Sequence, residues 1–90
     1  MGTALLTIKI MPTSPEVNLE EIKEKAQVVV EENKGRKCRF EEEPIAFGLK
    51  ALIMTIALSE DEESDKVENA LSEIEGVSSV ELIDYRRVVG

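Results

Sequence analysis

The sequence predicts an α+β protein with a ferredoxin-like βαββαβ fold, a two-layer sandwich in which two helices cover one face of an antiparallel four-stranded sheet. Three observations lead to this prediction. Four segments have the alternating or continuous apolar pattern of strands, and two have the apolar stripe of amphipathic helices. These segments follow one another in the order β-α-β-β-α-β. A shift of 48 residues, from Leu6 to Met54, also superposes the first strand on a similar apolar segment, which indicates a weak internal repeat.

The first strand and the first helix are predicted in the N-terminal third. Residues Ala4–Met11 alternate with the period of a strand, and the two prolines of Pro12–Pro15 mark a loop after it. Asn18 followed by Glu21 predicts a capping box at the start of a helix, and Gly35 predicts its C-cap. The apolar stripe of this helix consists of Leu19, Ile22, Ala26, Val29 and Val30.

The middle of the chain predicts two strands joined by a charged turn. Residues Arg36–Glu42 alternate, with Cys38 and Phe40 on one side, and predict a short polar strand. The acidic segment Glu41–Pro44 is expected to turn the chain. Residues Leu49–Leu58 are almost wholly apolar and too few for a typical buried helix, so they predict a central strand.

The last third predicts a helix and a closing strand. Ser64 or Asp65, at the end of the acidic loop Glu60–Asp65, is expected to cap the helix, and Gly76 to end it. The apolar stripe of this helix consists of Val67, Ala70, Leu71 and Ile74. The strand Val77–Val89 follows. It is expected to carry Val80 and Leu82 on one face and Ile83, Tyr85 and Arg87 on the other.

The two central strands have one apolar face and one mixed face. The face toward the helices is expected to consist of Leu6, Ile8, Ile10, Met54, Ile56 and Leu58. The open face is expected to consist of Leu5, Thr7, Lys9, Ile53, Thr55 and Ala57. RNA-recognition domains of this topology place aromatic residues on the open face. The lack of aromatics here excludes that class.

Composition excludes further classes of function. Ninety residues suit one domain, residues 1–90, and acids outnumber bases 19 to 11 for a net charge of −8. An acidic protein is poorly suited to bind nucleic acid directly. Histidine is absent, as are the common nucleotide-binding and hydrolase motifs. We therefore expect no enzyme, no catalytic or metal-binding residue, and no cofactor.

Cysteine use and hydropathy predict the location. Cys38 is the single cysteine and cannot form an internal disulfide, which fits a reducing compartment. No apolar stretch approaches the ~20 residues of a membrane-spanning helix. The N-terminus also lacks the pattern of a signal peptide. We expect a cytoplasmic protein that does not bind membranes.

Two charged clusters are candidates for binding. The bases are Lys34, Arg36, Lys37 and Arg39. They fit either an acidic partner or, more simply, the protected edge of a sheet. The acidic run Glu60–Asp65 lacks the spacing of a calcium loop, and a solvated loop is the simpler interpretation.

Two further segments are more informative. Phe47 and Gly48 precede a central strand, where the ring either anchors a protein partner or caps the core beside a glycine bulge. Near the C-terminus, Tyr85, Arg86 and Arg87 either are solvated or contact a carboxylate or phosphate. The residues alone leave both choices open.

With these segments in view, the sequence resembles the guanine-nucleotide exchange domain family of translation elongation factor 1-beta, in its short archaeal form. The resemblance covers nearly the whole chain and is carried by Ile8–Pro12, Ser14–Leu19, Glu43–Leu52 and Val80–Val88. Its most specific part is Pro-Ile-Ala-Phe-Gly-Leu-Lys, residues 44–50, which is similar to the Pro-Val-Gly-Tyr-Gly-Ile-Lys block of eukaryotic relatives.

The resemblance implies a ferredoxin-like fold and a partner, the GTPase elongation factor 1-alpha. Family members dock on this GTPase, disturb its nucleotide and Mg²⁺ site, and speed GDP release so that GTP enters. In eukaryotic members an aromatic of the block contacts the GTPase, and Phe47 matches it. A lysine next to last in their chain reaches the Mg²⁺ region, and Arg87 aligns with it. The sequence departs here, because arginine is planar and bulkier, and Val89 and Gly90 extend the chain.

The prediction is therefore an exchange factor, monomeric when free. Its predicted partner-binding residues are Phe47, Gly48, Lys50, Tyr85, Arg86 and Arg87. The alternative is a small-molecule-binding or regulatory ferredoxin-like module that acts through a dimer interface. Such a module would be stabilised by its ligand and would affect no GTPase.

Overall fold

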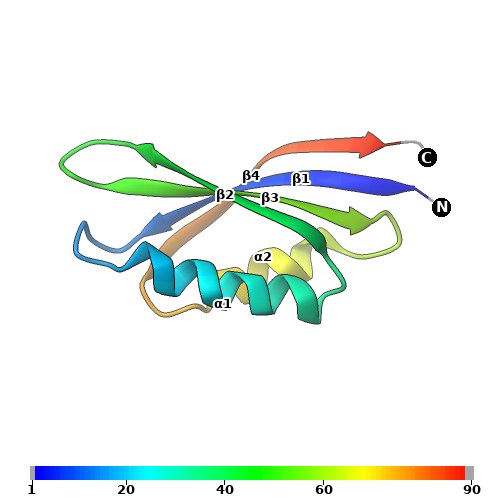
Figure 1. Ribbon diagram of the computed structural model, residues 1–90, viewed down its shortest axis with the longest axis horizontal. Helices are drawn as coiled ribbons and strands as arrows, with labels where there is room; N and C mark the ends of the chain where they lie inside the picture. Colours follow the sequence, from blue (N-terminus) through cyan, green and yellow to red (C-terminus); the bar gives the residue numbers. More distant parts are fainter. Residues whose placement is uncertain (1, 89–90) are drawn as a thin grey trace.

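A computed structural model describes residues 2–88, with the backbone alone at Lys37, and confirms the predicted order of elements. The elements are β1 (Thr3–Pro12), α1 (Leu19–Glu32), β2 (Arg36–Pro44), β3 (Lys50–Ser59), α2 (Ser64–Ser72) and β4 (Val77–Val88). The strands form one antiparallel sheet in the order β2-β3-β1-β4, and both helices cover the same face of it (Figure 1). The ferredoxin-like fold is therefore confirmed.

The core lies between the helices and the two central strands, as predicted. Residues that pair across β1 and β3 share a face, and Leu6 opposite Ile56 and Ile8 opposite Met54 are fully buried. Ile22, Ala26 and Val30 of α1 and Val67 and Leu71 of α2 close this layer. Among the side chains that the structure describes, which leave out that of Lys37, none that is polar or charged is buried. Apolar burial therefore holds the two layers together, at about 1.5–3 kcal/mol for each large side chain.

The first helix begins as predicted but ends earlier. The backbone N–H of Glu20 donates to Asn18 Oδ1 over 2.9 Å, so Asn18 is the N-cap. The helix ends at Glu32 with Asn33 as its C-cap, in place of the predicted Gly35, and Lys34 takes a left-handed conformation with φ 65. Gly35 is required for another reason. A Cβ atom there would lie 2.5 Å from Cγ1 of Val30, so the chain passes too close to α1 for any side chain.

Three further predicted boundaries need correction. The N-cap of α2 is Glu63, which makes no side-chain cap bond, rather than Ser64 or Asp65. The helix ends at Ser72 with Glu73 as its C-cap, so Gly76, which was predicted to end it, lies instead in the turn before β4, with φ +94. The segment Glu41–Pro44 is the end of β2 rather than a turn, because it continues to pair with β3. The turn consists instead of the five residues that follow Pro44.

The last strand contains a β-bulge that overturns one predicted face. Thr7 pairs with Asp84 and Ile8 pairs with Leu82, so Ile83 has no partner on β1. An extra residue reverses the alternation of side chains beyond it. Tyr85, opposite Leu6, therefore lies on the helix-bearing face together with Leu82. Arg87 lies opposite Ala4 and is on this face as well. The prediction that these two residues share the other face with Ile83 is wrong.

Candidate functional site

The tip of the β2–β3 hairpin presents an aromatic ring to solvent. Phe47 is 96% exposed, which excludes the interpretation that it caps the core. Two backbone hydrogen bonds close the loop beneath it. The N–H of Ile45 donates to the carbonyl of Leu49 over 2.8 Å, and the N–H of Leu49 donates to the carbonyl of Ala46 over 2.9 Å. Contact of the ring with a partner stays a prediction.

The backbone of this tip is strained. Phe47 has φ 54 and Gly48 has φ 80, two consecutive residues in the left-handed region. Glycine adopts this conformation freely, whereas a residue with a Cβ atom loses about 1–2 kcal/mol. An exposed phenylalanine gains no burial energy that would offset this cost. A strained, solvated aromatic is therefore a candidate for a functional contact.

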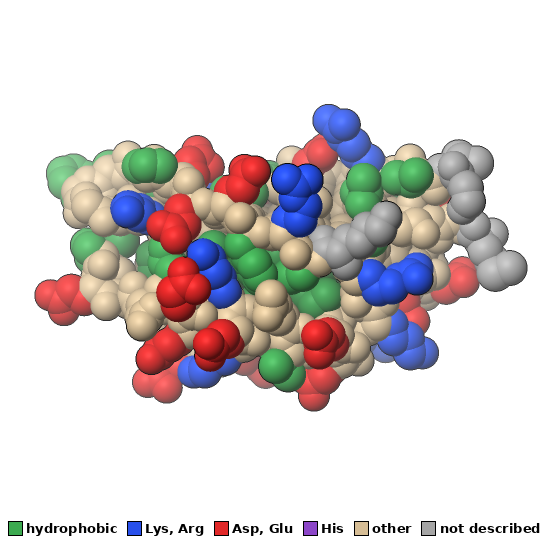
Figure 2. Space-filling model, in the orientation of Figure 1, with side chains coloured by type: hydrophobic (Ala, Val, Ile, Leu, Met, Phe, Trp, Pro, Cys, Tyr) green, Lys and Arg blue, Asp and Glu red, His purple; other side chains and the backbone are tan. Residues whose placement is uncertain are grey.

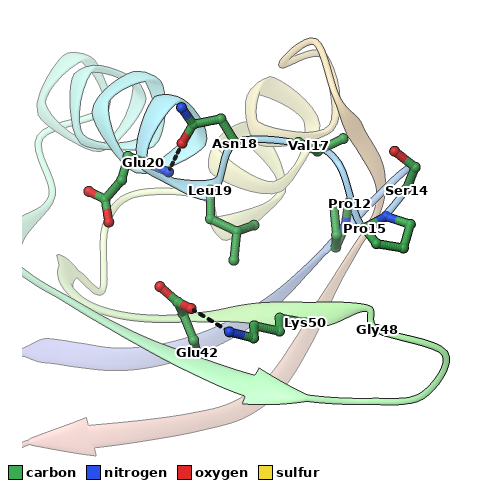
Figure 3. Close-up of a pocket in the computed structure, with 10 residues that line it drawn as sticks. All are labelled: Pro12, Ser14, Pro15, Val17, Asn18, Leu19, Glu20, Glu42, Gly48 and Lys50. Carbon is green, nitrogen blue, oxygen red and sulfur yellow. Dashed lines mark hydrogen bonds and ion pairs between the residues drawn. The ribbon is translucent and has the colours of Figure 1, made fainter.

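A cleft of about 460 Å³ lies beside the hairpin (Figure 3). The loop between β1 and α1, the start of α1 and the hairpin form its walls. Its lining residues are Pro12, Ser14, Pro15, Val17, Asn18, Leu19, Glu20, Glu42, Gly48 and Lys50. Two of the predicted partner-binding residues, Gly48 and Lys50, are therefore part of this wall, next to Phe47.

Charged groups cross the cleft. Nζ of Lys50 lies 3.9 Å from Oε1 of Glu42, and Nζ of Lys23 lies 3.5 Å from Oε2 of the same carboxylate. Lys23 also donates to Oε1 of Glu20 over 3.1 Å. The hydrogen bond to Glu20, and then the charges of Glu20 and Glu42, raise the pKa of Lys23 against the lowering effect of burial. Lys23 is therefore held in its charged form between α1 and the hairpin.

The other three predicted residues lie on β4 and are exposed, Tyr85 and Arg87 on the helix-bearing face and Arg86, opposite Leu5, on the other face. Tyr85 is 45% exposed. Nε of Arg86 donates to Oδ2 of Asp84 over 3.0 Å, and Nε of Arg87 lies 3.7 Å from Oε1 of Glu60. Both arginines are largely exposed. Exposed ion pairs contribute about 0–1 kcal/mol, so either arginine can exchange its carboxylate for another anion at little cost.

The six predicted residues form two groups at opposite ends of the molecule. Lys50 begins β3 and Ser59, at its other end, pairs with Thr3, which also pairs with Val88 of β4. Nine residues of strand correspond to about 30 Å. Figure 1 shows the hairpin at one end of the sheet and the end of β4 beside the N-terminal strand at the other. The residues of the hairpin and those of β4 are therefore far apart in the fold as well as in the sequence, and they do not form one site.

Sequence reasoning missed Glu42 and Lys23. Glu42 was grouped with its acidic neighbours as part of a turn, yet it continues the alternation of Cys38 and Phe40, which pack against the core. A carboxylate at an inward-facing strand position needs a cationic partner. That alternation was the available signal. Lys23 was not distinguishable from the other lysines of an amphipathic helix.

The two charged clusters have structural roles. The basic residues Arg36 and Arg39 lie on β2, an edge strand, as the simpler interpretation requires. The acidic loop pairs with Lys34, which precedes β2, and with β4, because Glu62 lies 3.7 Å from Lys34 Nζ and Glu60 pairs with Arg87. Within residues 2–88 no three histidine, cysteine or acidic side chains are grouped as metal ligands would be. The described helices include none with the length and apolar character needed to cross a membrane.

A solved structure shares this fold. The chain resembles the crystal structure of the ACT domain from the GTP pyrophosphokinase of Chlorobium tepidum, with a TM-score of 0.55, 18% identity, and coverage of 88% of this chain and 96% of that one. At this identity the likeness shows the fold alone.

Family and curated relatives agree with each other. The family model described as the EF-1 guanine nucleotide exchange domain matches residues 5–88. Elongation factor 1-beta of Methanocaldococcus jannaschii is 47% identical over 85 residues, which cover 93% of this chain and 96% of that protein. Elongation factor 1-beta of Methanothermobacter thermautotrophicus is 42% identical over 90 residues, 99% of this chain and all of that protein. The chain belongs to the EF-1 guanine nucleotide exchange domain family of exchange factors.

Proposed function

We propose that the protein promotes GDP release from, and GTP loading onto, the GTPase elongation factor 1-alpha during protein synthesis. The observation that carries the proposal is the family match over residues 5–88, together with relatives of nearly the same length. The exposed ring of Phe47 at a strained hairpin tip supports it, since the geometry suits contact with another protein.

Exchange of this kind requires no bond-forming chemistry in the factor. A factor that binds the nucleotide-free GTPase more tightly than the GDP form weakens GDP binding by the same free energy. Once GDP has left, GTP enters and displaces the factor by the same linkage. The lack of histidine is compatible with such a mechanism.

In this proposal the hairpin anchors the complex. Phe47 inserts into an apolar pocket of the GTPase, where an aromatic side chain contributes strongly to binding. Gly48 supplies the left-handed turn that follows the ring, with φ 80. Lys50, at the start of β3, extends the contact with an exposed positive charge.

The end of β4 acts on the nucleotide site of the GTPase. Arg87 exchanges Glu60 for anionic groups around the partner's GDP and Mg²⁺, with Tyr85 on the same face of β4 and Arg86 on the opposite face. The two contacts are about 30 Å apart, so the GTPase must reach both ends of the sheet. We infer that the protein does this as a single domain, monomeric when free, in the cytoplasm, and without nucleic acid or membrane.

The test is the release of fluorescent GDP from elongation factor 1-alpha, chased with excess GTP. We expect a large rise in release rate at substoichiometric amounts of this protein. An unchanged rate with an active GTPase would contradict the proposal. The alternative, a ligand-binding dimeric module, predicts thermal stabilisation by a small molecule instead, and no observation favours it, since the ACT-domain likeness concerns the fold.

The residue roles are tested separately with the double variant Phe47→Ala, Arg87→Ala. We expect this variant to fold normally, because both side chains are exposed, and to lose most of its exchange activity. Normal exchange by the double variant would reject these residues while leaving the function intact.

A further inference from the structure

The outer part of the hairpin has little support from the rest of the sheet. The last pair between β1 and β3 joins Ile10 and Leu52. Beyond it, β3 pairs with β2 alone, through Ala51 opposite Glu43 and Lys50 opposite Pro44. An isolated two-stranded ribbon is marginally stable in water. The position of the tip therefore depends on contacts with other elements.

Glu42 lies where such a contact is available. Its Cα partner is Leu52, so its side chain is on the helix-bearing face, in the same row as Phe40 opposite Met54. Phe40 packs against the core, whereas Glu42 lies one step further out, beside the start of α1. The row of inward-facing side chains thus changes from apolar to charged where the core ends.

The carboxylate of Glu42 joins three elements. It pairs with Lys23 of α1 over 3.5 Å and with Lys50 of β3 over 3.9 Å. Lys23 is 23% exposed and also pairs with Glu20 of its own helix over 3.1 Å. Pro15 also lies near the tip, since a Cβ atom on Gly48 would lie 3.8 Å from Cβ of Pro15. A van der Waals contact of this kind does not fix the orientation of the hairpin.

We propose that Glu42 is a positioning residue, which ties the β2–β3 hairpin to α1 through Lys23 and thereby sets the place at which Phe47 meets the GTPase. The inference rests on the proposed function for its effect on exchange. The tie itself is a property of the free protein and is measured without any partner.

The experiment compares Glu42→Gln with a matched control, Glu20→Gln. Both variants remove one carboxylate from Lys23 within the same cleft, but only Glu42 connects the lysine to the hairpin. Hydrogen exchange of the Ile45 and Leu49 amides, which close the loop, reports the order of the tip. We expect Glu42→Gln to accelerate their exchange about threefold and Glu20→Gln to leave it unchanged. Lys23→Met, which cuts the tie from the helix side, should match Glu42→Gln.

Two further measurements separate positioning from general stability. In 1 M NaCl, where charges are screened within about 3 Å, the difference between wild type and Glu42→Gln should disappear. In the GDP-release assay, Glu42→Gln should raise KM for the GTPase about threefold at unchanged kcat, with Glu20→Gln like wild type. If Glu42→Gln and Glu20→Gln give the same exchange rates at the Ile45 and Leu49 amides, Glu42 does not hold the hairpin to α1. If the protein drives no exchange at all, the proposed function fails while the hydrogen-exchange result still decides the tie.

Discussion

The hairpin end and the β4 end of the molecule present their exposed side chains in different ways. At the hairpin end a strained backbone holds Phe47 in solvent beside a cleft with Glu20 and Glu42 on its walls. At the β4 end the part of the strand beyond the bulge carries Arg86 and Arg87, each beside a carboxylate. Figure 2 shows more acidic than basic side chains toward the hairpin end of this face, with basic side chains among them, and acidic and basic side chains together toward the other end.

This difference suggests a division of labour between binding and exchange. A desolvated aromatic contributes free energy to the complex whatever nucleotide is bound, and so acts on affinity. A cation near the nucleotide and its metal stabilises only the state in which these groups leave their ground-state positions. It therefore acts on the rate of GDP release within the complex rather than on affinity. The two ends can therefore be separated by kinetics.

The largest expected effect is that of Phe47→Ala. Loss of a buried aromatic at an interface costs about 2 kcal/mol or more, so KM for the GTPase should rise about thirtyfold, with kcat nearly unchanged. Thermal stability should change little, because the ring is 96% exposed in the free protein. Val28→Ala, on the exposed face of α1, is the control and should promote GDP release as well as the wild type. A fall in kcat alone would contradict the assignment of Phe47 to the binding end.

The second effect is that of Arg87→Ala. We expect kcat to fall about tenfold at nearly constant KM, since a hydrogen bond to a charged group contributes about 1.5–3 kcal/mol. Arg87→Lys keeps the charge and should retain most of the rate. The control is Arg36→Ala, which removes an exposed arginine from the edge strand β2. If Phe47→Ala and Arg87→Ala change KM and kcat in the same way, the assignment of binding to the hairpin end and of nucleotide release to the β4 end is wrong.

The core was easier to predict than these two ends. The alternation of Leu6, Ile8 and Ile10 predicts the buried face of β1, because the apolar character of each side chain alone indicates on which side of the strand it is buried. The bulge at Ile83 depends on the register between β4 and β1, which are distant in sequence, and no local pattern reveals it. The face of Arg87 was therefore assigned wrongly.

The candidate site shows the same limit. The exposure of Phe47 depends on the left-handed turn that the whole hairpin imposes, so the sequence left two interpretations open. The residue pattern singled out Phe47 and the two C-terminal arginines, the family resemblance assigned them roles, and the family is confirmed. The ion pairs between Lys23 and Glu42 join residues 19 positions apart, and their pairing requires the packed structure.

A third prediction isolates the strain at the hairpin end. Phe47→Ala and Phe47→Gly both remove the ring, but only glycine adopts φ 54 without loss. Phe47→Gly should therefore be about 1 kcal/mol more stable than Phe47→Ala, a difference of about 4–8 °C in Tm, and both should be equally poor in exchange. Equal stability of the two variants would show that the tip relaxes once the ring is gone.

The smallest effect is a pH dependence confined to the hairpin end. The pKa of Lys23 is raised above its usual 10.5, mainly by the hydrogen bond to Glu20. A lysine whose pKa is higher in the folded state stabilises the protein fully below pH 10.5, and this contribution is lost as the pH rises through the folded value. Lys23→Met should thus lower Tm by about 1–2 °C at pH 8.

That deficit should vanish above the raised pKa, because the wild type then loses the charge as well. At the β4 end the charges are guanidinium groups, which remain protonated over this range. Any deficit of Arg86→Met should therefore persist through the same titration. Thermal unfolding of the wild type and both variants from pH 8 to 11.5 gives the comparison. If the Lys23→Met deficit is constant with pH, the lysine acts through its methylene packing rather than through its charge, and the hairpin end is held in another way.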